Sequence, residues 1–146
     1  LPILTDLAAI LNGYFAGGAV PTTLCLGLVS AENFTQFAPQ TDSMGSHPGW
    51  QEFTDYDEAT RQVWTPGVVL GDYPASINNP SVASVTPLSD GRAKGVFLCD
   101  ESTKGGATGQ LYGPWFFEEG TRDIQTAAPF EMDLTIKLVS NSPVAN

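Results

Sequence analysis

Few residues of this 146-residue chain could carry catalytic chemistry. The single histidine, His47, follows Ser46 in a tight turn, and no serine lies in the G-x-S-x-G pattern of a nucleophile elbow. Adjacent residues in such a turn rarely direct their side chains at each other, so we do not expect a Ser46–His47 pair to act. Phosphate-binding loops, dinucleotide fingerprints and paired Cys and His metal spacings are also missing. The sequence therefore predicts a protein that is not an enzyme and that uses no cofactor.

The two cysteines are Cys25 and Cys99. Both lie in strand-like runs, without the helix N-terminus or cationic neighbours that lower the pKa of a reactive thiol. Two buried free thiols are one interpretation, and a disulfide between them is the other. The sequence leaves this choice open.

Acidic residues are most concentrated just after position 51, at Glu52, Asp55, Asp57 and Glu58. Calcium binds about six to eight oxygen atoms, often from loop carboxylates and carbonyls. Asp55, Asp57 and Glu58 are therefore the candidate calcium ligands. Their spacing does not match the helix-loop-helix calcium motif, which favours a solvated acidic turn over a metal site.

Residues 31–57 show no clear hydrophobic period and carry isolated aromatic side chains. These are Phe34, Phe37, Trp50, Phe53 and Tyr56. Loops longer than about 12–15 residues in a compact domain are usually functional or mobile, and the aromatic side chains favour docking. We predict an extended arm over about 31–57 whose aromatic residues contact a partner or neighbouring subunit surface.

Aromatic side chains allow a second interpretation. Exposed rings of Trp50, Trp64 or Trp115 could form a flat platform that stacks on a sugar, with acidic groups bonding its hydroxyls. Most aromatic residues of a small β domain fill the core or seal a subunit contact instead, which is the stronger interpretation here.

The N-terminal segment predicts a helix over about 5–16. Thr5 or Asp6 can cap its start, and the glycines at 17 and 18 end it. Its apolar face follows helical spacing and consists of Leu7, Ile10, Leu11 and Tyr14. We expect this face to pack on a sheet or on a neighbouring subunit.

The remainder predicts short strands separated by Gly and Pro turns. Runs at 24–29, 62–65, 92–100 and 110–118 read as strands, and 76–84 is a strand broken by Pro80. Asp90 and Gly91 form a hairpin-type turn signal, and residues 130–138 alternate cleanly between apolar and polar side chains. The prediction is a single mainly β domain over 1–146: an antiparallel β-sandwich or open barrel with one N-terminal α-helix, a long arm, and a β body at about 22–30 and 62–139.

Charge excludes some partners. Six basic against 16 acidic residues give a net charge of −10, and the basic residues are scattered singly. Nucleic acid and anionic membranes both need clustered cations, so neither is expected as a partner. No apolar run approaches the roughly 18 residues of a membrane span. Leu1 is not an initiator residue, so whether residues precede it stays open.

One block resembles small virion structural proteins of tailed bacteriophages and prophages. Its residues are Ser46, His47, Pro48, Gly49, Trp50, Gln51, Glu52, Phe53, Tyr56, Arg61, Trp64, Thr65, Pro66 and Gly67. Later pieces follow in the same order: the Gly95–Leu98 run, Gly105 and Gly106, the Gly109–Tyr112 run, and the alternating strand from Phe130. The resemblance covers about 22–139. It departs from that pattern at Ala127–Pro129, where a Gly and Asp turn is expected.

The resemblance implies a head decoration or cement protein on the outer surface of the capsid. Its partners would be the major capsid protein and its own copies in a homo-oligomer, and no catalytic residues come with it. Two other functions stay open: a neck, tail or fibre structural protein, and a carbohydrate-binding module that uses exposed aromatic residues.

Overall fold

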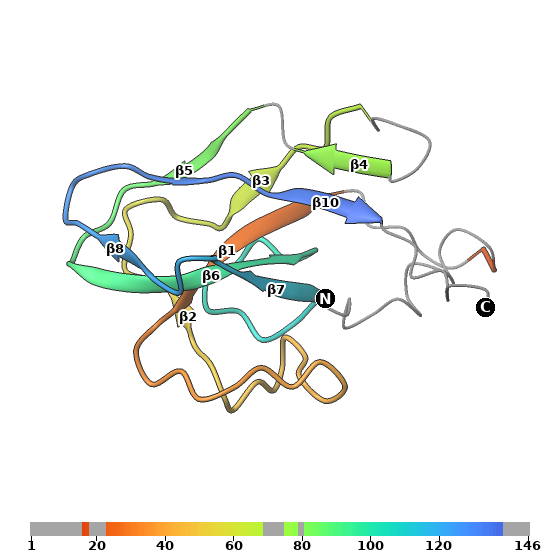
Figure 1. The fold of residues 1–146 in the computed structure, drawn as a ribbon, viewed down its shortest axis with the longest axis horizontal. Coiled ribbons are helices and arrows are strands. Elements are labelled where there is room, and N and C mark those ends of the chain that lie inside the picture. The colour runs from red at the N-terminus through yellow and green to blue at the C-terminus, as the bar shows by residue number, and fades with distance from the viewer. Residues whose placement is uncertain (1–15, 18–22, 69–74, 79–80, 139–146) are drawn as a thin grey trace, which may run out of the picture.

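The computed structural model describes residues 16–17, 23–68, 75–78 and 81–138, and this part of the chain is mainly β with antiparallel pairing (Figure 1). Nearly all of the helix predicted over about 5–16 lies outside the described residues. The strands are β1 (Leu24–Ser30), β2 (Glu52–Phe53), β3 (Gln62–Trp64), β4 (Ala75–Asn78), β5 (Ala83–Val85), β6 (Gly91–Cys99), β7 (Leu111–Phe116), β8 (Arg122–Ile124), β9 (Phe130–Met132) and β10 (Thr135–Leu138). No helix in the described part of the chain is long and apolar enough to span a membrane.

The main sheet has six strands. Its order is β2-β1-β6-β7, with β3 also paired to β1 and β8 also paired to β6. Strand β1 is buried on both faces from Cys25 to Ser30, as its unbroken apolar run predicts. Strand β6 lies beside it in antiparallel register, with Leu28 opposite Val96. These two strands form the centre of the main sheet, against which the described segments on both faces pack.

The last strand predicted from the sequence is two strands in the structure. Strand β9 pairs with β5, whereas β10 pairs with β4 in a separate two-stranded sheet. The side-chain alternation continues through Asp133 and Leu134, which lie between them, because alternation reports which face a residue occupies and carries no information about its partner strand.

The predicted hairpin turn at Asp90 and Gly91 was wrong. Strand β5 before it pairs with β9, and β6 after it pairs with β1, β7 and β8, so the two flanking strands are not partners. The Asp90 carboxylate instead accepts hydrogen bonds from the Thr126 backbone N–H and hydroxyl, both at 2.7 Å. This contact ties the start of β6 to the connection after β8.

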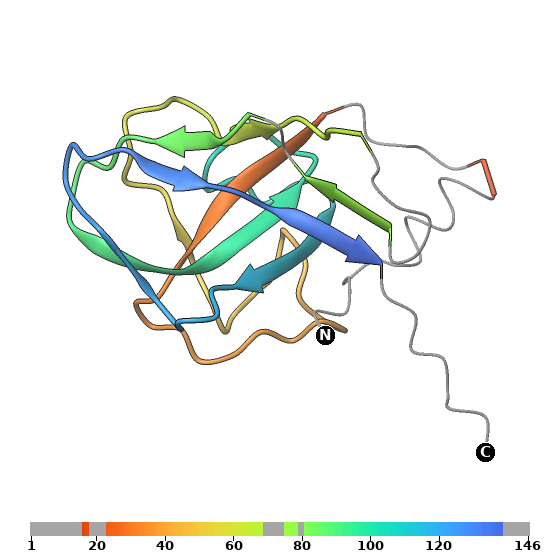
Figure 2. The same cartoon turned by 45° about the horizontal axis from the view of Figure 1, so that its top comes forward.

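Two hydrophobic clusters lie on opposite faces of the main sheet. The larger one joins β1 and β6 to β5 and β9, through residues such as Leu26, Leu98, Val85 and Met132. The smaller one contains Phe97 and is completed by Trp50 from the segment between β1 and β2. Figures 1 and 2 show that segment, in orange, on the side of β1 and β6 away from β5.

Residues 31–57, predicted as an extended arm, are folded against the main sheet. Ser30 N–H donates to Gln51 O at 2.8 Å, and β2 at the end of the segment pairs with β1. Within it, Gly49 O accepts hydrogen bonds from Thr35 and Gln36. A Cβ at position 49 would lie 2.3 Å from Gln36 O, so only glycine permits this approach.

Candidate functional site

A buried ion pair between Arg61 and Glu52 organises the motif block. Arg61 is 1% exposed, and its guanidinium donates to both carboxylate oxygens, from Nε at 2.9 Å and Nη2 at 2.8 Å. The remaining donors reach Glu101 O at 2.9 Å and Gly106 O at 3.1 Å, and Nη1 also lies 3.5 Å from Cys99 Sγ. Arg61 thereby joins the segment before β3 to the loop after β6.

The opposite charges of Arg61 and Glu52 compensate each other within the pair. Burial acts to lower the pKa of Arg61, but the hydrogen bonds and negative charge of Glu52 outweigh it and hold that pKa above its ordinary value. Glu52 also accepts a hydrogen bond from Gly105 N at 2.7 Å. Both oxygens of the Glu52 carboxylate therefore accept hydrogen bonds from within the protein, and the carboxylate has a structural role.

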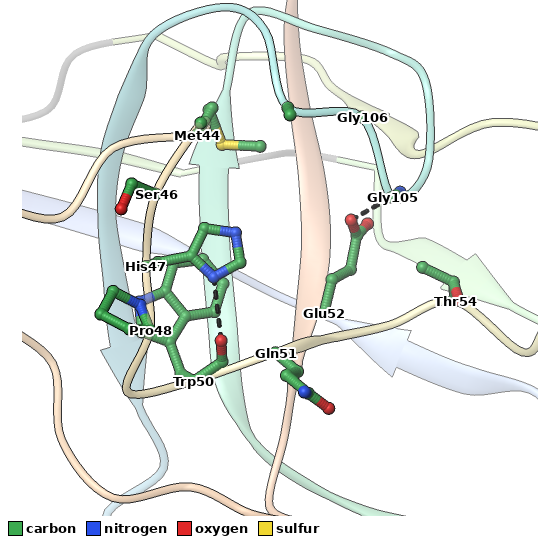
Figure 3. Close-up of a pocket in the computed structure, with 12 residues that line it drawn as sticks. Met44, Ser46, His47, Pro48, Trp50, Gln51, Glu52, Thr54, Gly105 and Gly106 are labelled. Atoms are coloured by element: carbon green, nitrogen blue, oxygen red, sulfur yellow. Dashed lines mark hydrogen bonds between the residues drawn. The ribbon is translucent and has the colours of Figure 1, made fainter.

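A hollow of about 450 Å³ lies beside Glu52, between residues 44–54 and the glycine-containing turn at 105–107 (Figure 3). His47 stacks on Trp50 at its wall, with ring centroids 3.9 Å apart and planes 21° apart. His47 Nδ1 lies 2.9 Å from Trp50 O. A carbonyl only accepts, so Nδ1 is the donor in this contact.

The structure shows whether the neighbouring side chains of Ser46 and His47 interact. In the described structure no hydrogen bond joins the Ser46 hydroxyl to His47, whose ring is held against Trp50 instead. Trp50 is itself anchored by a buried hydrogen bond from Nε1 to Asp42 Oδ2 at 3.0 Å. Asp42 was not singled out by sequence reasoning, and its spacing of eight residues from Trp50 gave no signal.

The candidate calcium ligands do not converge. No group of three or more His, Cys, Asp or Glu side chains within the described ranges could hold a metal ion. Glu58 instead accepts from Thr86, with backbone N–H distances of 3.0 and 2.9 Å and a hydroxyl distance of 3.0 Å. Burial acts to raise the pKa of Glu58, but these hydrogen bonds outweigh it and lower the pKa. Asp55 and Asp57 contact the residues after β5 through their backbones, because Asp57 N–H donates to Thr86 O and Leu88 N–H donates to Asp55 O.

The structure buries the candidate contact aromatics wholly or in part. Trp50 and Tyr56 are each 1% exposed, and Phe53 is half-buried against the larger cluster. Trp64 is 3% exposed and donates from Nε1 to Leu134 O at 3.3 Å. The rings of Trp50 and Trp64 therefore offer no open face to a sugar, and Trp115 is half-buried against the larger cluster.

Phe34 and Phe37 are half-buried against the smaller cluster, where they also meet Phe116 at the end of β7. The Phe34 and Phe116 ring centroids are 5.3 Å apart and those of Phe37 and Phe116 are 6.2 Å apart, both edge-to-face. Phe116 is 40% exposed. We call these three residues the aromatic patch. Phe116 was not predicted as a site residue, although strand alternation already places it on the face opposite Trp115.

Cys25 and Cys99 lie directly opposite each other on β1 and β6, and both thiols are free. Cys99 Sγ lies 3.2 Å from Glu101 O as well as close to Arg61. Burial raises the pKa of both thiols, that of Cys99 to about 11. The pair is thus protonated and packed in the smaller cluster.

The fold and the site together define a mainly β protein with antiparallel sheets, in which a buried ion pair lies under a shallow hollow and an aromatic patch lies at one end of the sheet. Comparison with family models, with curated proteins and with solved structures gave no match to this chain.

Proposed function

We propose that this chain is a non-enzymatic structural protein of a tailed-bacteriophage virion, of the head decoration or cement type, that binds the major capsid protein on the outer surface of the capsid. The finer architecture belongs to the same proposal: the main sheet and the two small sheets form the layers of an antiparallel sandwich. The predicted N-terminal helix would contribute to contacts with its own copies or with the capsid.

The observation that carries this proposal is the structural use of the motif block. Trp50, Glu52, Arg61 and Trp64 are the block's most distinctive residues, and each is engaged in a contact that holds the fold together. Because these residues hold the fold together, the resemblance of the block to virion structural proteins supports a shared fold whose surface binds partners. A shared reaction would instead need reactive side chains kept open to a substrate.

Surface charge supports the outer face of a shell. Among the described cations, Arg61 and Arg122 pair with glutamates, Lys94 lies over the Phe34 ring, Lys104 donates to Tyr56 O, and Arg92 is exposed. With a net charge of −10, few positive groups remain to offset the acidic surface. Such a surface repels packaged DNA and suits contact with a basic protein partner.

The experiment that tests the proposal measures copy number. Particles from the source culture are banded on a density gradient, and this chain is quantified by mass spectrometry against the most abundant shell protein. A ratio within a few fold of one supports lattice-wide decoration. Tens of copies or fewer per particle would favour the neck, tail or fibre alternative. Absence from particles would reject the virion proposal.

A carbohydrate-binding function has a separate test. Oligosaccharides that stack on tryptophan quench its fluorescence, whereas the burial of Trp50 and Trp64 predicts no quenching. Saturable quenching that disappears in Trp115→Ala, the remaining half-buried tryptophan, would favour the binding module over the virion protein.

A further inference from the structure

We infer that the aromatic patch and the outer edge of β7 form a docking surface for an extended, basic segment of a partner protein. The inference deepens the proposed function, on which it rests for the partner's identity, because it states the chemistry that the capsid partner must present.

The aromatic patch supplies the apolar part of this surface. Phe34 and Phe37 come from the segment after β1, and both meet the ring of Phe116 from β7. Large aromatic side chains contribute most of the binding energy at many interfaces because they bury much area with little conformational entropy. An aromatic ring that is 40% exposed next to two others is therefore a natural anchor.

The edge of β7 supplies the backbone part. Phe117 N–H donates to Lys94 O at 3.1 Å, so the backbone of Phe117 turns towards β6. Backbone groups alternate along an antiparallel strand, which turns those of Phe116 and Pro114 away from β6. Pro114 has no N–H, and its position on this outer side leaves the pairing with β6 intact.

The outward groups are therefore the Phe116 N–H and C=O and the Pro114 C=O. Strand β7 ends the order β2-β1-β6-β7, and within the described ranges no strand pairs with its outer side at Pro114 and Phe116. An extended segment can add to such an edge through main-chain hydrogen bonds while its alternate side chains contact neighbouring pockets. Here those side chains would meet the aromatic patch.

The charges around the aromatic patch indicate which kind of partner segment it would bind. Glu32 and Glu118 are exposed and lie two residues from Phe34 and Phe116, respectively, and the only described cation on the aromatic patch is Lys94, whose Nζ is 5.5 Å from the Phe34 centroid. The whole chain carries a charge of −10, so a second copy would bring like charge to the contact. A basic partner segment gains from the same field.

The test uses a defined probe, so that it does not depend on finding particles. A peptide of alternating lysine and valine is titrated into the isotope-labelled full chain, with a peptide of alternating glutamate and valine as the charge control. We expect saturable shifts concentrated at the Phe116 amide and its neighbours with the lysine peptide only. Shifts located elsewhere, equal binding of both peptides, or no binding of the lysine peptide would overturn the inference.

Matched variants locate the contact. Phe116→Ser should weaken the lysine peptide at least fivefold, whereas Leu88→Ser, which removes another apolar side chain that is 56% exposed, should change affinity less than twofold. Circular dichroism confirms that both variants are folded, and Phe34→Ser serves if Phe116→Ser is not. Equal effects of the two serine variants would contradict the docking surface.

Two further outcomes separate this inference from the proposed function. If the chain is abundant on particles but Phe116→Ser rebinds stripped particles as well as the unmodified chain, the docking surface is wrong and the virion role stands. If sedimentation shows dimers that Phe116→Ser abolishes, a second copy occupies the aromatic patch and the inference of a basic partner fails.

Discussion

Arg61 and Glu52 show how the block that carries the resemblance acts at the scale of single residues. Both side chains are almost fully removed from water, with 0% and 7% exposure. Moving two charges out of water is unfavourable, and only close geometry with additional hydrogen bonds offsets that loss. The five donors of Arg61 all find acceptors here.

Arg61→Leu should lower the free energy of unfolding by about 3–5 kcal/mol, because it leaves the Glu52 carboxylate buried without its partner. Urea denaturation measures the change. In the double variant Arg61→Leu with Glu52→Leu the orphan charge is gone, so part of the lost stability should return. A double variant at the sum of the two single losses would contradict the pairing argument.

Tyr56 differs from Arg61, because it is buried with a polar group left unsatisfied. Its hydroxyl is buried and makes no hydrogen bond, while Lys104 Nζ donates to its carbonyl oxygen and lies 4.4 Å from its ring centroid. Burial, with added repulsion from Glu52, raises the pKa of the phenol, so it remains neutral in all ordinary buffers. The ring, and not the hydroxyl, is what the fold uses.

Tyr56→Phe should therefore leave stability unchanged or raise it by up to about 1 kcal/mol, since an unsatisfied buried polar group is removed at nearly constant shape. Thermal and urea unfolding both report this. Trp64→Phe is the contrast, because it loses the hydrogen bond to Leu134 O and leaves a void, and it should be clearly destabilised. A large loss in Tyr56→Phe would mean that the hydroxyl has a partner in solution.

At the scale of elements, close backbone contact between β6 and β7 depends on Gly95. A Cβ at this position would lie 2.1 Å from Trp115 O and 2.9 Å from Phe116 Cα, which are both backbone atoms. Side chains can rotate away from such an overlap, but a paired strand cannot. Gly95 therefore allows β7 to lie close to β6, and so fixes the position of the strand whose outer edge belongs to the proposed docking surface.

Gly95→Ala should destabilise the protein by about 1–3 kcal/mol or more by forcing β7 away from β6. Gly91→Ala in the same strand is the control, since its Cβ would lie 3.2 Å from the Phe53 ring, a side chain that can shift. Chemical denaturation compares the two. Equal losses would show that β7 moves freely and would weaken the account of its fixed edge.

The contact between Glu58 and Thr86 ties the segment after β2 to the end of β5, and it predicts a pH dependence. The folded-state pKa of Glu58 is lowered, so its stabilisation is present above the unfolded pKa of about 4.3 and is lost as pH falls through the lower folded pKa. The melting temperature should fall from about pH 5 to pH 3, and the fall should be smaller in Glu58→Gln.

Three other carboxylates contribute to the same acid sensitivity, and one of them is Glu119, whose pKa is lowered by the hydrogen bond from Arg122. Hydrogen bonds from Thr126 lower the pKa of Asp90, and those from Thr103 lower the pKa of Glu101, so some fall must remain in Glu58→Gln. Glu131→Gln, an exposed substitution on β9, is the matched control and should retain the full fall. A fall of the same size in Glu58→Gln would contradict a role for the Glu58–Thr86 contact.

At the scale of the whole molecule, acidic charge is the dominant property. A net charge of −10 on 146 residues repels itself, and two of the described cations, Arg61 and Arg122, are already paired with glutamates. Added salt screens this repulsion over distances of about 10 Å at 0.1 M. The melting temperature should rise by a few degrees between about 20 and 200 mM sodium chloride. A fall would mean that ion pairs outweigh the repulsion.

Much of the strand pattern could be predicted from the sequence. The unbroken apolar run predicted that β1 is buried on both faces, β3 and β7 fall within the predicted runs, and β6 overlaps its predicted run but begins one residue earlier, because burial on a face imposes a short-range pattern. The site was much less predictable. The aromatic patch joins Phe34 to Phe116, which are far apart in the chain, and the Trp50 anchor at Asp42 follows no periodic rule.

The sequence by itself determined the net charge and the β class, since each depends on composition or on neighbours within a few residues. The tertiary structure alone decided that residues 130–138 split between two sheets, that Cys25 faces Cys99, that Trp50 and Tyr56 are buried, and that residues 31–57 cover the sheet. These outcomes depend on which strands pair, and pairing is a competition between distant segments that local pattern does not encode.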